Sequence, residues 1–395
     1  MPTLFDKIIN HFNKRGIQFT DRYMPYFICS VGCHILNLWN KSPHVGARGF
    51  ARLGGVVQDL RLHVLMIAPP GFSKSLYIES FLNPYTGIMP TSLSAMPSTC
   101  THAGLVGAVD RRGTMQGVFE RDAHRIIGFD EFHALDVSGK QEHSTEMMDS
   151  LLRLLDSGRY SRPMRNGVLE YDTYSTLWGG VQQVRMGLES GIERRLLFIF
   201  FSPNKREREY VFDAWCDSHD IVFDIGGFEE IRNDILDLYQ DSLNNLRTVV
   251  LPDNFREIMK DITDGHNHAE TVKRMMYGYT LMNGYAGDDE LVVKVDNRLK
   301  DMMTRVIYFK SLMALDPMYA VVKGILEGNG MEMSMTSLCK EIARDCHVRI
   351  TTVRKSVENM VRDGFLYADK RFVPHCKKPV VYMGPTDDLL EIGFT

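Results

Sequence analysis

Short runs of apolar residues alternate along the chain with longer stretches in which apolar residues recur at helical spacing. Continuous apolar runs of this length predict strands that are buried on both faces, as in a parallel sheet. The runs lie at residues 64–67, 126–129, 175–181 and 196–200. The stretch over residues 147–155 carries an apolar stripe with a helical period. Strands that alternate with helices predict an α/β fold in which helices flank a parallel sheet.

The two ends of the chain follow other patterns. Residues 1 to about 60 predict helices, because apolar residues gather on one face of the first helix and Tyr26–Trp39 continues a buried one. Residues 203–315 also predict mostly helices. From Met318 onward, three short helical stretches precede two short strands, a sequence of elements that predicts a winged-helix domain.

Two segments predict β-hairpins. The Asn166-Gly167 pair lies between alternating residues, and such a pair is the strongest short-range hairpin signal. The segment DRRGTMQGVFERD, residues 110–122, predicts a second, shorter hairpin rich in polar residues. Both hairpins carry arginine near the expected turn.

Composition limits the classes of protein to which the chain can belong. Of its 395 residues, 44% are hydrophobic and 24% are charged, so the chain can bury a core and is not disordered. The net charge of −4 excludes a globally basic nucleic-acid binder, and any DNA-binding surface must be local. Seven scattered cysteines indicate reduced thiols, and no apolar run approaches the roughly 20 residues of a membrane span. We therefore expect no membrane contact and a reducing compartment, either the cytoplasm or the nucleoid.

The segment after the first apolar run is typical of a phosphate-binding loop. The run leads into Pro70, Gly71, Phe72, Ser73, Lys74, Ser75 and Leu76, and then into a helix. In this arrangement, backbone N–H groups of the loop and of the helix N-terminus point at an anion. Lys74 would contact the β- and γ-phosphates of ATP, and the Ser75 hydroxyl would bind Mg²⁺. The pattern expects glycine where Ala68 and Ser73 stand.

A pair of acids at the end of the second apolar run strengthens this interpretation. The segment RIIGFDEF ends its strand at Asp130 and Glu131, the Walker B pattern of P-loop ATPases. Asp130 would hold Mg²⁺ together with Ser75, and Glu131 would polarise the attacking water. Two solvated acids at a strand end are common, but their order and separation from the phosphate loop favour a shared site.

In their order along the chain, these segments resemble the AAA+ module of the minichromosome maintenance (MCM) replicative helicases. The resemblance covers roughly residues 60 to 315. The matching segments are HVLMIAPPGFSKSL, THAGLVGAV, IIGFDEF, MRNGV, ERRLLFIF and DNRLKDMMTRV. The phosphate loop of that family also lacks a glycine before the Lys-Ser pair, as at Ser73. Many members share a C-terminal winged helix.

The resemblance implies roles for five arginines. Arg165, at a hairpin tip, would face DNA in the central channel of a hexameric ring, and Arg111 and Arg112 would lie near the same channel. Arg195 corresponds to the arginine finger that reaches ATP in the neighbouring subunit. Arg298 corresponds to sensor 2, which also acts across the subunit interface.

Three further residues complete the candidate sites. Gln182 stands near the sensor 1 position, where the family has asparagine, and a glutamine there can still orient water. Arg354 and Lys355 lie near the start of the expected recognition helix of the winged helix, the part that enters the major groove in DNA-binding members. A winged helix that contacts protein instead of DNA is the alternative.

The resemblance divides the chain into four parts and implies a function. The parts are an N-terminal helical segment (1–55), an AAA+ P-loop ATPase core (56–250), a helical lid (251–316) and a winged-helix domain (317–395). The implied function is ATP-dependent DNA unwinding during replication by a homo-hexamer that uses ATP and Mg²⁺. Its partners would be single- and double-stranded DNA and replication proteins. Because the family's large N-terminal domain is missing, we expect a virus, plasmid or integrated element as the source.

Two alternatives remain open. The first is an AAA+ replication initiator or loader, which switches DNA binding with ATP but does not unwind DNA processively. The hairpin at Asn166-Gly167 discriminates, because translocation requires it and switching does not. The second is a degenerate ATPase with a structural or regulatory role, which Ala68 and the displaced Gln182 suggest.

Overall fold

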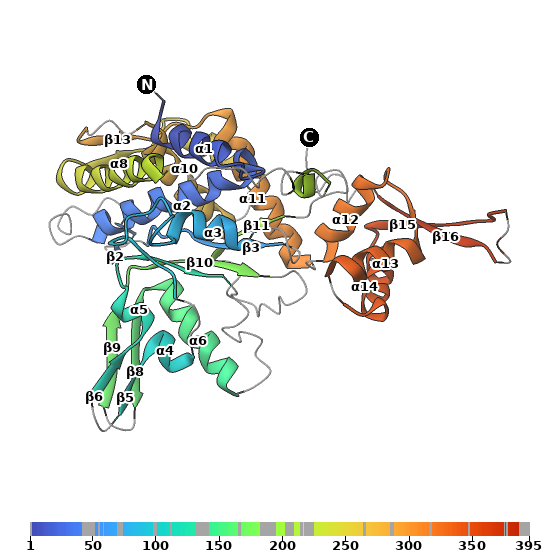
Figure 1. Cartoon of the computed structure of the whole chain (residues 1–395), viewed down its shortest axis with the longest axis horizontal. Coiled ribbons are helices and arrows are strands. Elements are labelled where there is room, and N and C mark those ends of the chain that lie inside the picture. The colour runs from blue at the N-terminus through green and yellow to red at the C-terminus, as the bar shows by residue number, and fades with distance from the viewer. Residues whose placement is uncertain are drawn as a thin grey trace.

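The structure is a computed structural model of the chain, and Figure 1 shows it from one side. It describes residues 2–41, 52–53, 56–57, 59–68, 74–97, 101–110, 113–130, 142–164, 167–181, 195–201, 209–213, 216, 225–263, 266–284, 288–315, 318–346, 348–374, 376 and 378–386.

Within the described residues, five parallel strands form a central sheet (Figure 1). They are β3 (His63–Ile67), β4 (Ser94–Ala95), β7 (Ile126–Phe129), β10 (Thr176–Val181) and β11 (Leu196–Phe200). Their order is β11-β3-β10-β7-β4, and every neighbouring pair is parallel. All residues of the four longer strands are buried, as their continuous apolar runs require. The predicted α/β fold with a helix-flanked parallel sheet is confirmed, and β4 is an additional short strand.

Alternate residues of the sheet point into two separate cores. On β3, Val64 and Met66 lie in one core, whereas Leu65 and Ile67 lie in the other. This follows because successive side chains of a strand point to opposite faces of the sheet. The first core is shared with α1 (Leu4–Lys14), α2 (Thr20–Lys41), α3 (Lys74–Leu82), α8 (Ile225–Asn244), α9 (Phe255–Ile262), α10 (His266–Gly284) and α11 (Asn297–Leu315). The second is shared with α4 (His102–Val106), α5 (Val118–Arg121) and α6 (Glu142–Asp156).

The N-terminal helices belong to the same body as the helices of residues 225–315. Helix α2 is buried from Tyr23 to Asn40, and Trp39 donates a hydrogen bond of 3.0 Å to the Leu246 carbonyl. Helices α2 and α10 touch through their backbones at Gly32 and Gly278, where a Cβ atom on either glycine would clash with the opposite helix.

The expectation of helix up to about residue 60 is wrong at residues 52–53 and 56–57. Helix α2 spans Thr20–Lys41, and the strands β1 (Arg52–Leu53) and β2 (Val56–Val57) form a small antiparallel pair. Leu53 pairs with Val56. The dipeptide between them is Gly-Gly, which suits the tight turns that join hairpin strands and does not favour helix. Residues 203–315 likewise contain a short parallel pair, β12 (Thr248–Val250) with β13 (Glu290–Val292), that helical spacing did not predict.

The hairpin predicted at Asn166-Gly167 is present, but the one predicted over residues 110–122 lies at residues 107–116, because Val118–Arg121 forms helix α5 and buries Val118 and Phe119. The two hairpins extend together from the side of the sheet that carries α4, α5 and α6 (Figure 1). One consists of β5 (Gly107–Asp110) and β6 (Gly113–Gln116), and the other of β8 (Arg159–Met164) and β9 (Gly167–Asp172). Met164 pairs with Gly167, so the second hairpin reverses one residue earlier than a turn centred on Asn166-Gly167 would.

The C-terminal region forms a separate group of elements beside the sheet (Figure 1). Its three helices are α12 (Met318–Gly328), α13 (Met335–Cys346) and α14 (Ile350–Arg362). The hairpin strands β15 (Leu366–Arg371) and β16 (Val380–Pro385) are antiparallel, and β14 (Met333–Ser334) pairs with β16. The predicted three helices and hairpin are therefore present, with β14 as an addition.

Across the described part of the chain, no helix combines the length and the apolar character needed to span a membrane.

Candidate functional site

The strands that carry the sequence-predicted motifs are neighbours in the sheet. Strand β10 lies between β3, which precedes the phosphate-loop segment, and β7, which precedes Asp130. Val181 at the end of β10 is level with Ile67 of β3, and the Ala68 N–H donates a hydrogen bond of 3.2 Å to the Val181 carbonyl. The carboxyl ends of the three strands therefore meet at one edge of the sheet, where ligands bind in open α/β sheets.

Lys74 and the backbone of Asp130 both lie close to a single glycine at this edge. A Cβ atom added to Gly180 would be 2.7 Å from the Asp130 carbonyl oxygen and 3.4 Å from Lys74 Cβ. Lys74 begins helix α3, and both Lys74 and Ser75 are half-buried, as is Asp130. The structure thus brings Lys74 and the adjoining Ser75, at the start of α3, close to the backbone of Asp130, which is 55 or more residues away in sequence.

Glycines hold helix α3 close to the sheet. A Cβ atom on Gly128 of β7 would be 2.5 Å from Leu82 Cδ1 and 2.9 Å from Ile78 Cγ2 of α3. Together with Gly180, this glycine lets α3 approach β7 and β10 more closely than a larger residue would allow. Sequence reasoning missed both glycines, although glycine inside a strand is a sign of close approach by another element.

Several predicted site residues lie outside the described residues. They are Pro70, Gly71, Phe72 and Ser73 of the phosphate loop, the Walker B residue Glu131, and the sensor residue Gln182. Leu76, the last predicted residue of the loop, is described together with Lys74 and Ser75, and its side chain is 40% exposed. In the sequence, Gln182 directly follows Val181, the last residue of β10, and Glu131 directly follows Asp130. A hydroxyl and a carboxylate are oxygen donors of the kind that Mg²⁺ prefers, and Ser75 and Asp130 provide them here.

Arg195 lies at the opposite edge of the sheet from Lys74. It precedes β11, whose first residue, Leu196, is level with His63 at the start of β3. The length of the strand separates the two edges by about 16 Å at 3.3 Å per residue. Arg195 Nη2 forms an ion pair of 2.8 Å with Asp156 Oδ2 at the end of α6. The structure therefore does not bring Arg195 to the Lys74 edge of its own chain.

Arg298 contacts the N-terminal helices. Its Nη1 atom lies 3.3 Å from Asp6 Oδ1, its Nη2 atom lies 3.7 Å from Asp21 Oδ1, and its guanidinium stacks over the Phe5 ring at 4.6 Å. It is about one third exposed. These contacts connect α11 with α1 and α2 within one chain.

The two hairpins lie side by side, with β5 against β9. A Cβ atom on Gly167 would be 3.5 Å from Val109 Cγ1, and one on Gly107 would be 3.3 Å from Leu169 Cδ2. Asp110 pairs with Gly113 and Met164 with Gly167, so both hairpins reverse near the same place. The predicted DNA-contacting residues at these reversals are Arg111, Arg112 and Arg165, which lie outside the described residues.

A buried polar network fixes the root of the β8–β9 hairpin. Arg61 is almost fully buried, and its guanidinium is paired with Asp59. Its Nη1 atom donates 3.0 Å to the Ser175 carbonyl after β9, and its Nη2 atom donates 3.4 Å to the Leu155 carbonyl before β8. Burial alone would raise the pKa of Asp59, but the charge of Arg61 and its hydrogen bonds outweigh burial and lower the pKa to about 2.

His63, the first residue of β3, contributes to the same network. Its Nδ1 atom accepts a hydrogen bond of 2.9 Å from the Leu177 N–H, so the proton resides on Nε2, which lies 3.3 Å from the Leu155 carbonyl. Burial, with a smaller contribution from the charge of Arg61, lowers the pKa of His63 well below its usual value. A neutral His63 therefore fixes the end of α6 to the sheet.

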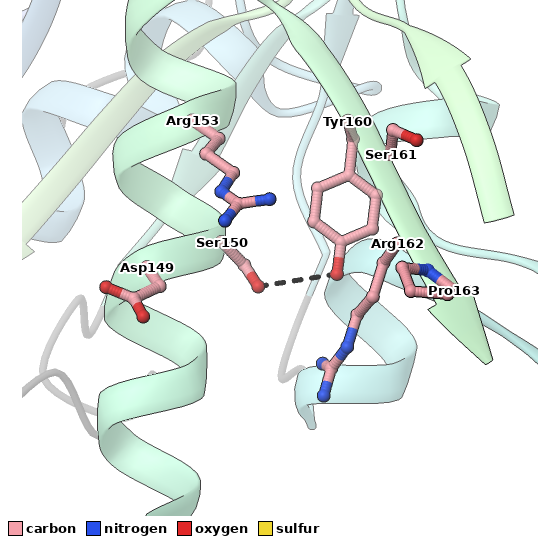
Figure 2. A pocket seen from close by; sticks show the side chains of 7 residues that line it. All are labelled: Asp149, Ser150, Arg153, Tyr160, Ser161, Arg162 and Pro163. Carbon is pink, nitrogen blue, oxygen red and sulfur yellow. Dashed lines mark hydrogen bonds between the residues drawn. The ribbon is translucent and has the colours of Figure 1, made fainter. Parts of the chain in front are cut away.

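A cleft of about 380 Å³ separates α6 from β8. Figure 2 shows the side chains of Arg153 and Arg162 reaching into the space between the two elements, with Arg153 beside the Tyr160 ring and Arg162 below it. At its floor, Ser150 Oγ lies 3.4 Å from the Tyr160 hydroxyl and 3.0 Å from His102 Nε2. These hydrogen bonds connect α4, α6 and β8, and thus connect the two hairpins at their bases.

The candidate DNA-contacting residues of α14 are exposed. Arg354 lies 3.3 Å from Glu358 one turn along the helix, and Lys355 is exposed beside it. On the neighbouring hairpin, Arg371 is paired with Glu332 and Asp369 at 2.7 Å each, which neutralises much of its charge.

No protein-family model and no curated protein sequence matches this chain. The chemistry of the site is therefore inferred from its residues and their positions.

Proposed function

We propose that the protein is an ATP-dependent DNA helicase of the MCM type that works as a hexameric ring on single-stranded DNA during replication. The observation that carries this proposal is that Lys74 and the Asp130 backbone both lie close to Gly180, at the carboxyl edge of three neighbouring parallel strands. Phosphate-loop, Walker B and sensor residues must all contact one triphosphate, so the strands that bear them must be neighbours. The order β3-β10-β7 satisfies this requirement.

Each residue of the edge has a role in the proposed reaction. Lys74 contacts the β- and γ-phosphates, and the N-terminus of α3 points its free N–H groups at them. Bound Mg²⁺, held by Ser75 and Asp130, would neutralise charge on the phosphates. Glu131 polarises the attacking water, and Gln182 orients it. The close approach of α3 at Gly128 and Gly180 fixes the distance between the lysine and the acids.

The position of Arg195 favours a ring. An arginine at the amino edge of the sheet lies about 16 Å from the carboxyl edge, and no side chain spans that distance. If Arg195 stabilises charge on the γ-phosphate, it does so in a neighbouring subunit, which makes the site incomplete in a single chain. Repeated head-to-tail interfaces of this kind form a ring where the rotation between subunits closes. An arginine finger contributes about 10³- to 10⁵-fold in rate.

The paired hairpins supply the DNA-contacting part of the proposal. Two neighbouring hairpins that reverse at the same place would present Arg111, Arg112 and Arg165 as one local cationic surface on a chain of net charge −4. Cationic loops of this type bind the phosphates of single-stranded DNA without reading its sequence. We propose that the exposed Arg354 and Lys355 of α14 provide a second DNA contact in a winged helix.

The test is ATP hydrolysis measured with and without single-stranded DNA, on the parent protein and on Glu131→Gln. We expect turnover that DNA stimulates and that the variant abolishes, because the variant keeps the shape of the site and removes the carboxylate. Turnover that is indifferent to DNA would favour the initiator or loader, which is the second candidate. Rings without turnover would favour the non-catalytic alternative.

A further inference from the structure

The ion pair between Arg195 and Asp156 joins two parts of the molecule that the proposed function uses separately. We propose that Asp156 is a positioning residue for Arg195, and that the pair couples the interface arginine to the root of the β8–β9 hairpin. This inference rests on the proposed function. It adds a residue and a route by which ATP in a neighbouring subunit affects the DNA-contacting hairpin.

Asp156 occupies the junction between α6 and the hairpin. It is the last residue of α6, and β8 begins three residues later at Arg159. Between them, Gly158 has a φ of +71°, and its carbonyl accepts a hydrogen bond of 2.6 Å from the Thr173 N–H, which directly follows β9 at the root of the hairpin. A displacement of Asp156 therefore acts on both strands of the hairpin at once.

The root of the hairpin is held against the sheet by groups that do not involve Asp156. The Arg61 and His63 side chains both contact the Leu155 carbonyl, and Arg61 also donates to the Ser175 carbonyl. Both side chains are buried. Because this network already anchors the root, removal of the Asp156 carboxylate should leave the hairpin folded and change only its connection to Arg195.

The solvent exposure of the two side chains indicates that Asp156 positions Arg195 and not the reverse. The Arg195 side chain is 15% exposed, whereas that of Asp156 is 64% exposed. The arginine stem is thus fixed by packing, and the carboxylate orients the guanidinium at the surface. An exposed ion pair adds little to stability, so its contribution lies in orientation. A misplacement of about 1 Å in a catalytic group costs up to about 10²-fold in rate.

The experiment compares Asp156→Asn, Asp156→Glu and the matched control Asp149→Asn in the full chain. Asp149 is an exposed acid on the same helix, two turns earlier. We expect Asp156→Asn to lower DNA-stimulated ATP turnover by on the order of 10- to 100-fold with an unchanged melting temperature. Asp156→Glu should recover part of the loss because it keeps the charge, and Asp149→Asn should match the parent.

A mixing assay separates action across the interface from damage within one subunit. Lys74→Ala subunits lack a working site but keep Arg195, and Asp156→Asn subunits keep a working site. If Asp156 acts through Arg195 on the neighbour, random mixing restores about a quarter of the parental sites, because each site is completed by the next subunit of the ring. The mixture should therefore exceed the summed activity of the two separate proteins.

The outcomes are distinguishable. A parent without ATP turnover would overturn the proposed function and this inference with it. An active parent, an inactive Arg195→Ala and an Asp156→Asn variant equal to the parent would overturn only the role of Asp156. A slow Asp156→Asn variant whose activity is not restored by Lys74→Ala subunits would also overturn it, because the defect would then lie within the chain.

Discussion

Substitution of Gly180 by alanine tests the proposed nucleotide site most directly. The added methyl group would lie 2.7 Å from the Asp130 carbonyl oxygen and 3.4 Å from Lys74 Cβ. Ordinary contact begins near 3.4 Å, so the Asp130 backbone or β10 must move by about 0.7 Å. The nearest atom belongs to the backbone, and rotation of a side chain cannot relieve the contact.

The expected loss of activity exceeds the expected loss of stability. Overpacking costs about 1–3 kcal/mol, and the lower entropy of the unfolded chain with alanine offsets about 0.4–1 kcal/mol of this. In the site, a shift of 0.7 Å separates the lysine from the acids, and a displacement of this size costs roughly 10-fold or more in rate. Gly180→Ala should therefore fold while losing most of its turnover.

The assay is steady-state hydrolysis of Mg-ATP, together with binding of a fluorescent ATP analogue and the melting temperature by circular dichroism. Gly284→Ala is the matched control, because a Cβ atom at Gly284 would meet no described residue outside its own helix within 4 Å, and that glycine ends helix α10. The reasoning fails if Gly180→Ala keeps its fold and also keeps the parental kcat/KM. Lys74 and Asp130 would then not need their observed separation.

Two further predictions concern the hairpin and its root. Arg165→Ala should bind ATP like the parent but lose DNA-stimulated turnover and unwinding. The control Arg159→Ala removes an exposed arginine that is paired with Glu170 in the same hairpin, and it should keep both activities. Unwinding at the parental rate in Arg165→Ala would exclude the hairpin tip from translocation. Because the folded-state pKa of Asp59 is lowered from 3.8 to about 2, its ion pair stabilises the fold above pH 3.8 and ceases to do so as pH falls toward 2. Urea unfolding should show the parent more stable than Asp59→Asn by roughly 2 kcal/mol or more at neutral pH, with the difference shrinking over that acid range, and a difference that grows on acidification would contradict the assignment.

The sequence predicted the buried strands well because they are buried on both faces. The runs that became β3, β7, β10 and β11 needed no knowledge of their neighbours, and Asn166-Gly167 marked its hairpin to within one residue. Short elements were missed, since β4, β12 and β13 have two or three residues and owe their existence to pairing partners. Local periodicity cannot predict such partners.

The candidate site was predicted in its residues but not in its geometry. Lys74, Ser75 and Asp130 were identified from motifs, and the structure places Lys74 beside Asp130. The importance of Gly180 was not predicted, because it follows from the packing of α3 over β10. The Arg195–Asp156 pair was not predicted either, since its members are 39 residues apart and on different elements. The roles of the arginines stay predictions.

The contact between Gly32 and Gly278 has a consequence for how the chain can be divided. Where two helices touch backbone to backbone, neither can be exchanged for a helix of ordinary sequence without separating the pair. A fragment that begins near residue 56 would expose the apolar residues of α8, α10 and β3 that pack against α1 and α2. The first forty residues are thus a structural part of the proposed motor, and its smallest autonomous unit begins at α1, well before the phosphate loop.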